Sequence, residues 1–257
     1  ILGTLTSLSL PPYNYLFINF ITLGLFFIFI FQKKRSTKKK YSFLYGWFFG
    51  FGYFLSNLYW IAISLTFDKN FIFLIPITII IIPSFLALFY AFVSLGFYLF
   101  HPKNILSAFF LFSLLFGVVE FLRGMILTGF PWNLIIYSLS ENLKFLSVLS
   151  IVGTYSLNLF VISFFTIPAI FIFRKSQKEI VVSILLLILP IIFFTYGTYK
   201  KKEFTNYTTK KNPYTIRIIG SNINLDRFYD DTQAEDIINE LISISSPEKK
   251  RKIIFLW

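Results

Sequence analysis

Long runs of apolar residues, separated by short polar segments, dominate the chain up to residue 199. A helix that crosses a bilayer needs roughly 20 apolar residues, because each residue rises about 1.5 Å and the hydrocarbon core is about 30 Å thick. Five or six runs have this length, at residues 15–31, 43–65, 71–100, 105–127, 145–173 and 180–199. The pattern predicts a polytopic α-helical membrane domain over residues 1–199 with about six spans.

Two apolar stretches depart from this regular pattern, residues 1–10 and the run at residues 71–100. Residues 1–10 are apolar but too short to span, so we expect the remnant of a truncated first helix. The third run is longer than one straight span needs and contains Pro76 and Pro83, which favour a tilt, a kink or a partly interfacial segment. Trp257 closes an apolar run with nothing after it to pair or cap it, so both ends are expected to be cut.

Composition narrows the class of protein. The 257 residues are 56% hydrophobic and 21% aromatic but only 14% charged, which is too apolar for an ordinary soluble domain and excludes disorder, collagen and coiled coil. The chain has no cysteine and a single histidine, His101, so it offers no disulfide, thiolate or zinc site. We expect neither a metal nor a cofactor.

The net charge of +12 is typical of membrane topology rather than of nucleic-acid binding, because +6 of it lies in one loop at residues 33–40. The basic loops are residues 32–40, 101–104 and 174–178. They alternate with loops near Asp68 and Glu141 that carry no cationic excess. Basic loops stay in the cytoplasm, so alternation places everything after residue 199 on the extracytoplasmic, periplasmic side of a bacterial inner membrane.

Beyond residue 199 the chain holds 11 basic and 8 acidic residues, which predicts a soluble domain over residues 200–257. Residues 214–219 and 253–257 are predicted to be buried strands. Between them Thr232 and Glu235 form a capping box before an apolar helical repeat that Pro247 stops. This order predicts a β-α-β unit, the beginning of an α/β domain whose remainder is missing.

Glu120 and Arg123 are the only charged pair inside an otherwise apolar span, and their spacing places them on one helix face. One interpretation is a structural ion pair near the helix end that ties this helix to its neighbours. The other is functional: Arg123 faces a polar cavity and meets a lipid phosphate, with Glu120 holding it in place. The sequence leaves both open.

Nearby aromatic and small residues are also open to a structural interpretation. Trp132 follows in a turn-forming extracytoplasmic loop and, taken alone, is a membrane-interface anchor, as are Tyr59 and Trp60. A stripe of small residues predicts close helix packing. It consists of Gly46, Gly50 and Gly52.

Six segments occur in a fixed order along the chain. They are Pro11-Pro12-Tyr13, Gly46-Trp47-Phe48-Phe49-Gly50-Phe51-Gly52, Tyr59-Trp60, Glu120-Phe121-Leu122-Arg123-Gly124, Thr128-Gly129-Phe130-Pro131-Trp132 and Gly153-Thr154-Tyr155-Ser156-Leu157-Asn158. In this order and spacing they resemble the membrane domain of bacterial apolipoprotein N-acyltransferases. Residues 216–223 resemble the opening strand of the nitrilase-like domain, an α-β-β-α sandwich, that follows in that family.

The chain departs from the family pattern in its last part. The family usually has a glutamine before an Asn-Ile pair and a Lys-Trp pair downstream, where this chain has Gly220 or Ser221 and Phe228-Tyr229. The resemblance matches Trp257 to the tryptophan of a Trp-Pro-Glu motif that carries the catalytic glutamate. The Glu-Lys-Cys triad is therefore expected beyond Trp257, so no catalytic residue lies in this chain and the fragment is expected to be inactive alone.

The resemblance implies an acyltransferase of lipoprotein maturation. Such an enzyme takes an acyl chain from a phospholipid onto its cysteine and passes it to the N-terminal diacylglyceryl-cysteine of an apolipoprotein. The implied partners are the phospholipid donor, the diacylglyceryl-modified apolipoprotein and the membrane, with no nucleic acid. Candidate lipid or substrate contacts are Glu120, Arg123, Trp132 and Tyr229.

Two other classes remain possible from the residues themselves. One is a polytopic membrane transporter, which is expected to show paired repeats and several intramembrane polar residues. The sequence shows no clear repeat and one intramembrane charged pair. The other is a membrane scaffold with a soluble extracytoplasmic appendage that binds a partner.

Overall fold

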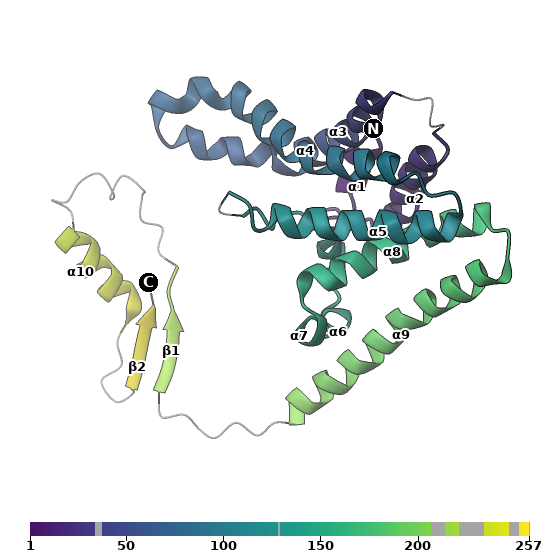
Figure 1. Cartoon of the computed structure of the whole chain (residues 1–257). Helices are drawn as coiled ribbons and strands as arrows, with labels where there is room; N and C mark the ends of the chain where they lie inside the picture. Colours follow the sequence, from purple (N-terminus) through teal and green to yellow (C-terminus); the bar gives the residue numbers. More distant parts are fainter. Residues whose placement is uncertain (34–37, 128, 207–213, 221–233, 247–251, 257) are drawn as a thin grey trace. The chain divides into compact units, whose positions relative to one another are not determined.

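The computed structural model describes residues 1–33, 38–127, 129–206, 214–220, 234–246 and 252–256. The chain divides into two compact units, Ile1–Phe204 and Thr205–Trp257. Within the described residues, the first unit contains helices only, and the second contains a two-stranded sheet and one helix (Figure 1).

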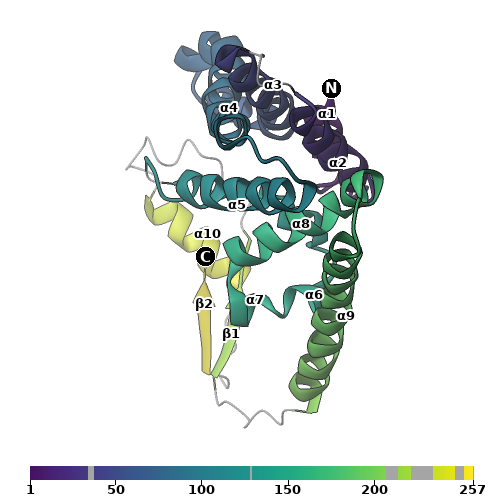
Figure 2. The same ribbon diagram turned by 45° about the vertical axis from the view of Figure 1, so that its right-hand side comes forward.

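The first unit consists of successive helices joined by short loops. It begins with α1 (Leu2–Ser7), α2 (Ile18–Phe31), α3 (Lys39–Leu58) and the 3-10 segments η1 (Tyr59–Thr66) and η2 (Lys69–Leu74). It continues with α4 (Ile75–Phe100), α5 (Ile105–Arg123), η3 (Ile135–Leu139), α6 (Leu143–Leu146), α7 (Leu149–Val152), α8 (Thr154–Phe173) and α9 (Gln177–Asn206). α5 and α8 lie side by side (Figure 1 and Figure 2).

Five helical segments of the described chain are long and apolar enough to cross a membrane, judged by length and composition. They are Lys39–Thr66, Lys69–Phe100, Ile105–Arg123, Thr154–Phe173 and Gln177–Asn206. These five support the predicted multi-pass helical membrane domain. The remaining predicted run, residues 15–31, contains only the 14-residue α2. At about 1.5 Å per residue this helix is shorter than the thickness of the hydrocarbon core.

Two predicted span boundaries are wrong. Residues 145–173, expected as one span, contain the end of α6, then α7 and α8. Gly153 has φ +76° and ψ 168°, does not continue a helix, and separates α7 from α8. The run 105–127 is helical only to Arg123, where Gly124 caps α5 and the chain turns. Both corrections lengthen the loop that connects α5 to α8.

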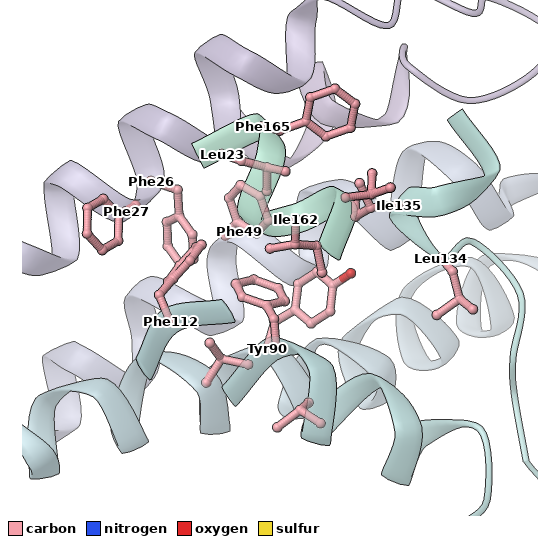
Figure 3. Packing of buried hydrophobic residues seen from close by; sticks show 14 of the residues in the cluster. Leu23, Phe26, Phe27, Phe49, Tyr90, Phe112, Leu134, Ile135, Ile162 and Phe165 are labelled. Atoms are coloured by element: carbon pink, nitrogen blue, oxygen red, sulfur yellow. The ribbon is translucent and has the colours of Figure 1, made fainter. Parts of the chain in front are cut away.

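The core of the first unit combines aromatic and aliphatic side chains contributed by several helices (Figure 3). Phe26 of α2 stacks on Phe49 of α3 with ring centroids 4.2 Å apart. Phe112 of α5 packs edge-on against Phe27 of α2 at 5.3 Å. Helices in a bilayer associate through close packing, because lipid tails are as apolar as the side chains. These interlocking rings therefore hold α2, α3 and α5 together.

α3 and α4 approach each other closely at two glycines. A Cβ at Gly46 would lie 2.2 Å from the Tyr90 carbonyl oxygen, and one at Gly50 would lie 3.0 Å from the α4 backbone. The predicted close packing is confirmed at these two positions. Gly52 contacts another helix, since a Cβ there would lie 2.8 Å from Thr4 Oγ1 of α1.

The second unit has the predicted β-α-β order. β1 (Tyr214–Ile218) and β2 (Lys252–Leu256) pair in parallel over their full length, and α10 (Ala234–Ser245) lies between them in the sequence. Arg217 Nη1 donates a hydrogen bond of 2.9 Å to the carbonyl oxygen of Ser245. A cation at the carboxyl end of a helix satisfies carbonyl groups that have no partner within the helix, so this contact joins the sheet to α10.

The prediction that these strands are buried is wrong for the unit as described. Ile216 is 62% exposed and Ile218 is 79% exposed. A sheet of two strands with one helix forms too few layers to enclose both of its faces. Thr232, Tyr229 and Trp257 lie outside the described residues, and the nitrilase-like sandwich stays a prediction.

Candidate functional site

Glu120 and Arg123 form a buried ion pair in the last turn of α5. Both side chains are fully buried. Arg123 Nε donates to Glu120 Oε2 at 2.8 Å, and Nη2 donates to the same oxygen. The Tyr90 hydroxyl of α4 donates to Glu120 Oε1 at 2.5 Å. Each carboxylate oxygen thus accepts from a protein donor, as a buried charge requires.

The same guanidinium binds the loop that follows α5. Arg123 Nη1 donates to the carbonyl oxygens of Phe130 at 2.6 Å and Trp132 at 2.9 Å. The Phe130 N–H donates back to the Arg123 carbonyl oxygen at 2.9 Å. The Arg123 side chain therefore donates four hydrogen bonds, and a guanidinium has five N–H donors. The two from Nη1 join the end of α5 to the backbone of the loop that follows it.

A tight turn lets this loop return over the helix end. Gly129 has φ +82°, which glycine adopts without strain, and a Cβ there would lie 2.2 Å from the Gly124 carbonyl oxygen. Further along, the Tyr53 hydroxyl of α3 donates to the Asn133 carbonyl oxygen at 2.8 Å. Arg123 and Tyr53 hold successive parts of the loop, so its backbone is fixed by two helices.

Segments that are distant in sequence meet around this loop. A Cβ at Gly124 would lie 1.7 Å from the Tyr155 hydroxyl of α8, and the Tyr155 ring packs against Phe121 at 5.4 Å. Asn158 of α8 accepts a hydrogen bond from the Ile136 N–H at 2.9 Å. α8 therefore supports the turn at Gly124 and the chain that leaves the loop.

Trp132 brings this loop to the surface. It is 51% exposed, and its ring stacks on Trp60 of η1 with centroids 5.6 Å apart and planes at 17°. From the sequence, each of these two tryptophans is predicted to be a membrane-interface anchor on its own. The structure joins them into one exposed aromatic pair, which we call the Trp60–Trp132 stack.

Tyr137 in η3 lies beside the loop and is outside the spanning segments. Its hydroxyl donates to the Pro131 carbonyl oxygen at 3.1 Å. Burial raises the pKa of the Tyr137 hydroxyl above its ordinary value. The hydroxyl therefore stays protonated at neutral pH and remains a donor to the loop.

The network around Arg123 is suited to positioning rather than to bond chemistry. Its side chains bind one another and the backbone, with the guanidinium held on carbonyl oxygens. No three His, Cys, Asp or Glu residues in the described part of the chain lie together as a metal site requires. Of the four candidate contact residues, the structure brings Glu120, Arg123 and Trp132 together, and Tyr229 lies outside the described residues.

Sequence reasoning missed Tyr53 and Tyr90. A signal for both was present, because a phenol within an apolar span needs an acceptor and Glu120 is the carboxylate of such a span. The role of Gly124 had no local signal. It depends on Tyr155, which belongs to another helix.

A family model described as "Apolipoprotein N-acyltransferase N-terminal domain" matches residues 2–167 of this chain. The chain belongs to this family. The match runs from α1 into α8 and contains all of the residues described around Arg123. The predicted resemblance is confirmed.

Several relatives bear the name apolipoprotein N-acyltransferase. The protein of Rhodopseudomonas palustris is 30% identical over 253 residues, which cover 95% of this chain and 46% of the relative. The protein of Rickettsia prowazekii is 33% identical over 215 residues, covering 82% and 42% respectively. The Agrobacterium fabrum protein is 28% identical over 269 residues, covering 99% and 49%. The chain thus spans about half the length of the curated apolipoprotein N-acyltransferases that it matches.

Proposed function

We propose that this chain forms the membrane domain of an enzyme that transfers an acyl chain from a phospholipid to the N-terminal diacylglyceryl-cysteine of lipoproteins. Its family membership and its apolar helices support this proposal. The activity is proposed for the full-length protein. The chain contains no cysteine, so we assign the nucleophile, with the glutamate and lysine of the family's triad, to sequence beyond the α/β unit.

The proposed reaction consists of two acyl transfers. The cysteine thiol, deprotonated by the glutamate, attacks the ester carbonyl of the phospholipid, and the C–O bond breaks to release the lysophospholipid, which takes the proton. The α-amino group of the apolipoprotein then attacks the thioester, the C–S bond breaks and the thiol is restored. Lysine stabilises the oxyanion of each tetrahedral intermediate.

One observation carries the proposed role of this chain. Arg123 hydrogen-bonds to the loop that contains Trp132, and we call this set of bonds the clamp. Glu120 fixes the Arg123 guanidinium, which fixes the backbone at Phe130 and Trp132. We therefore propose Arg123 as a positioning residue that acts through Trp132, rather than as a direct contact of a lipid phosphate. Tryptophan rings concentrate at the membrane interface, where they pack against glycerol and acyl chains. On this basis the Trp60–Trp132 stack borders the path by which lipid substrates reach the active site.

Kinetics of the full-length protein test this role. Trp132→Ala is expected to raise the KM for the phospholipid about tenfold and to reduce kcat less, since the ring would contact the lipid before reaction. Trp132→Phe should retain most of the effect of the ring. Phe67→Ala removes another exposed aromatic, 66% accessible, and should leave both constants unchanged. An unchanged KM in Trp132→Ala would remove Trp132 from the lipid path.

We also propose that the protein lies in a bacterial inner membrane with the Glu141 loop and the second unit on the periplasmic side. The alternation of basic loops supports this orientation. Single cysteines can report the orientation in full-length protein whose proposed nucleophilic cysteine is replaced by alanine, because residues 1–257 contain no cysteine. With a membrane-impermeant maleimide on outer-membrane-permeabilised cells, Leu143→Cys should be labelled and Asn104→Cys protected. The opposite labelling would reverse the orientation.

A further inference from the structure

A pocket of about 530 Å³ lies beside α6 and the last turns of α9, and it contains none of the residues around Arg123. Pockets that hold small ligands span roughly 300–1,000 Å³. Its walls combine cations with aromatic rings. The cations are Lys144 and Lys201, and the rings are those of Phe194 and Phe204. Glu141 also lines the pocket.

One face of α9 forms a wall of this pocket. Phe194, Gly197, Lys201 and Phe204 recur at intervals of three or four residues, which places them along a single helix face. At Gly197 a Cβ would lie 1.7 Å from the Lys144 carbonyl oxygen. α6 and α9 are therefore in backbone contact at this position. The two walls of the pocket meet at this point.

The cations of the pocket are not neutralised. In the described part of the chain, neither Lys144 nor Lys201 forms an ion pair, whereas the adjacent Lys200 pairs with Glu203 at 2.8 Å. Lys144 Nζ lies 4.9 Å from the ring centroid of Phe194, a wall of the same pocket. Glu141 is the carboxylate of the pocket, and its Oε1 accepts from Asn14 Nδ2 at 2.6 Å. The excess of positive charge favours an anion.

The pocket extends along α9 from its apolar part to its first polar turn. Phe194 belongs to the apolar body of α9, and Lys201 lies in the first polar turn after it. Seven residues of helix separate them by about 10 Å. An acyl chain against Phe194 would therefore bring the phosphate of the same lipid to the level of Lys201.

We propose that this pocket binds the phosphate of a phospholipid head group, with Lys144 and Lys201 as its cationic contacts. Phe194 packs against the first methylenes, and Phe204, three residues beyond Lys201 on α9, lies beside the head group. This lipid would be bound in addition to the acyl donor of the proposed reaction. α9 buries few of its own residues, among those described Glu179, Ser183 and Gly197. A lipid wedged beside α6 adds a contact near the end of α9, from which the chain continues to the second unit.

Native mass spectrometry in detergent tests the proposal by binding alone. It uses the full-length protein with its proposed nucleophilic cysteine replaced by alanine, so that no acyl chain can be transferred. Dioleoyl phosphatidylglycerol should form a 1:1 adduct, and dioleoylglycerol, which has the same chains and no phosphate, should not. Lys144→Gln with Lys201→Gln should weaken the adduct roughly thirtyfold, because each lysine near an anionic lipid contributes about fivefold. Lys144→Arg with Lys201→Arg should retain it.

A charge-matched control separates a site from general attraction. Lys200→Gln with Lys202→Gln also removes two positive charges, from the residues on either side of Lys201 and outside the pocket lining, and should leave the adduct unchanged. Equal weakening by both double variants would overturn the proposal, as would an equally strong adduct with dioleoylglycerol. Displacement of the lipid by millimolar inorganic phosphate would also overturn it, because the site would then be one for free phosphate. Gel filtration of every variant excludes misfolding as the cause of a loss.

Discussion

Arg123 and the pair Lys144 and Lys201 are cations of the same helical unit, but their charges are used differently. Arg123 is buried, pairs with Glu120 and binds two loop carbonyls. Lys144 and Lys201 line a pocket and form no ion pair within the described residues. A charge inside an apolar bundle must be paired by the protein itself, whereas a cation beside open space keeps its capacity for an external anion. The rare charge in a span therefore indicates where the fold depends on polar contacts, and the pocket indicates where a ligand could bind.

The largest effect is expected from breaking the buried pair. Arg123→Met leaves Glu120 buried with the Tyr90 hydroxyl as its remaining partner among those described. Loss of one partner of a buried pair costs about 3–5 kcal/mol. The free energy of unfolding, measured by SDS titration of the full-length protein in mixed micelles, should fall by about this amount.

Two further variants identify the cause. Arg123→Met combined with Glu120→Gln should recover much of the loss, because no buried charge then lacks a partner. Arg174→Met removes an exposed arginine just after α8 and should change stability by less than about 0.5 kcal/mol. If Arg123→Met behaved like Arg174→Met, the clamp would not contribute to stability.

A smaller loss is expected where α5 meets α8. A Cβ at Gly124 would lie 1.7 Å from the Tyr155 hydroxyl, so Gly124→Ala should destabilise the protein by about 1–3 kcal/mol through overpacking. Tyr155→Phe in the same chain removes the clashing oxygen and should restore part of the loss. Gly24→Ala is the control, since a Cβ there meets nothing within 4 Å, and alanine favours a helix. Thermal unfolding of the three variants would contradict the packing argument if Gly124→Ala and Gly24→Ala were equally stable.

The hydroxyl that completes the carboxylate site should contribute less. Tyr90→Phe removes the donor to Glu120 Oε1 and leaves that oxygen buried without it, a loss of about 1–2 kcal/mol. Tyr41→Phe, an exposed tyrosine 48% accessible, should have no effect in the same SDS titration. A neutral Tyr90→Phe would mean that Arg123 alone satisfies the carboxylate.

Much of the membrane fold could be predicted from the sequence because spans follow from local apolar length. The runs predicted at residues 105–127 and 180–199 correspond to the helices Ile105–Arg123 and Gln177–Asn206. The division of residues 145–173 could not be predicted, because it rests on the positive φ of Gly153, and glycine also occurs within helices. At the site, the spacing of Glu120 and Arg123 predicted that they share a helix face, and they do.

The partners of that pair could not be predicted. The Arg123 guanidinium binds backbone carbonyls of a loop, and backbone acceptors have no sequence signature. The pocket beside α9 likewise depends on Gly197 approaching Lys144, a tertiary contact between segments that are separate in sequence. Both features require the packing of helices, which hydrophobic periodicity constrains only to a face.

The smallest effect on stability is expected at the two pocket lysines. Lys144→Gln with Lys201→Gln removes two charges that have no ion-pair partner in the described chain, so in lipid-free detergent the free energy of unfolding should change by less than about 0.5 kcal/mol. Adding phosphatidylglycerol should then stabilise the wild-type protein and not the variant, because a ligand stabilises the state that binds it. Thermal unfolding with and without the lipid measures both the effect of the substitutions on stability and the stabilisation by the lipid. A large loss in lipid-free detergent would show that these lysines serve the fold, as Arg123 does, and the contrast between the two groups would disappear.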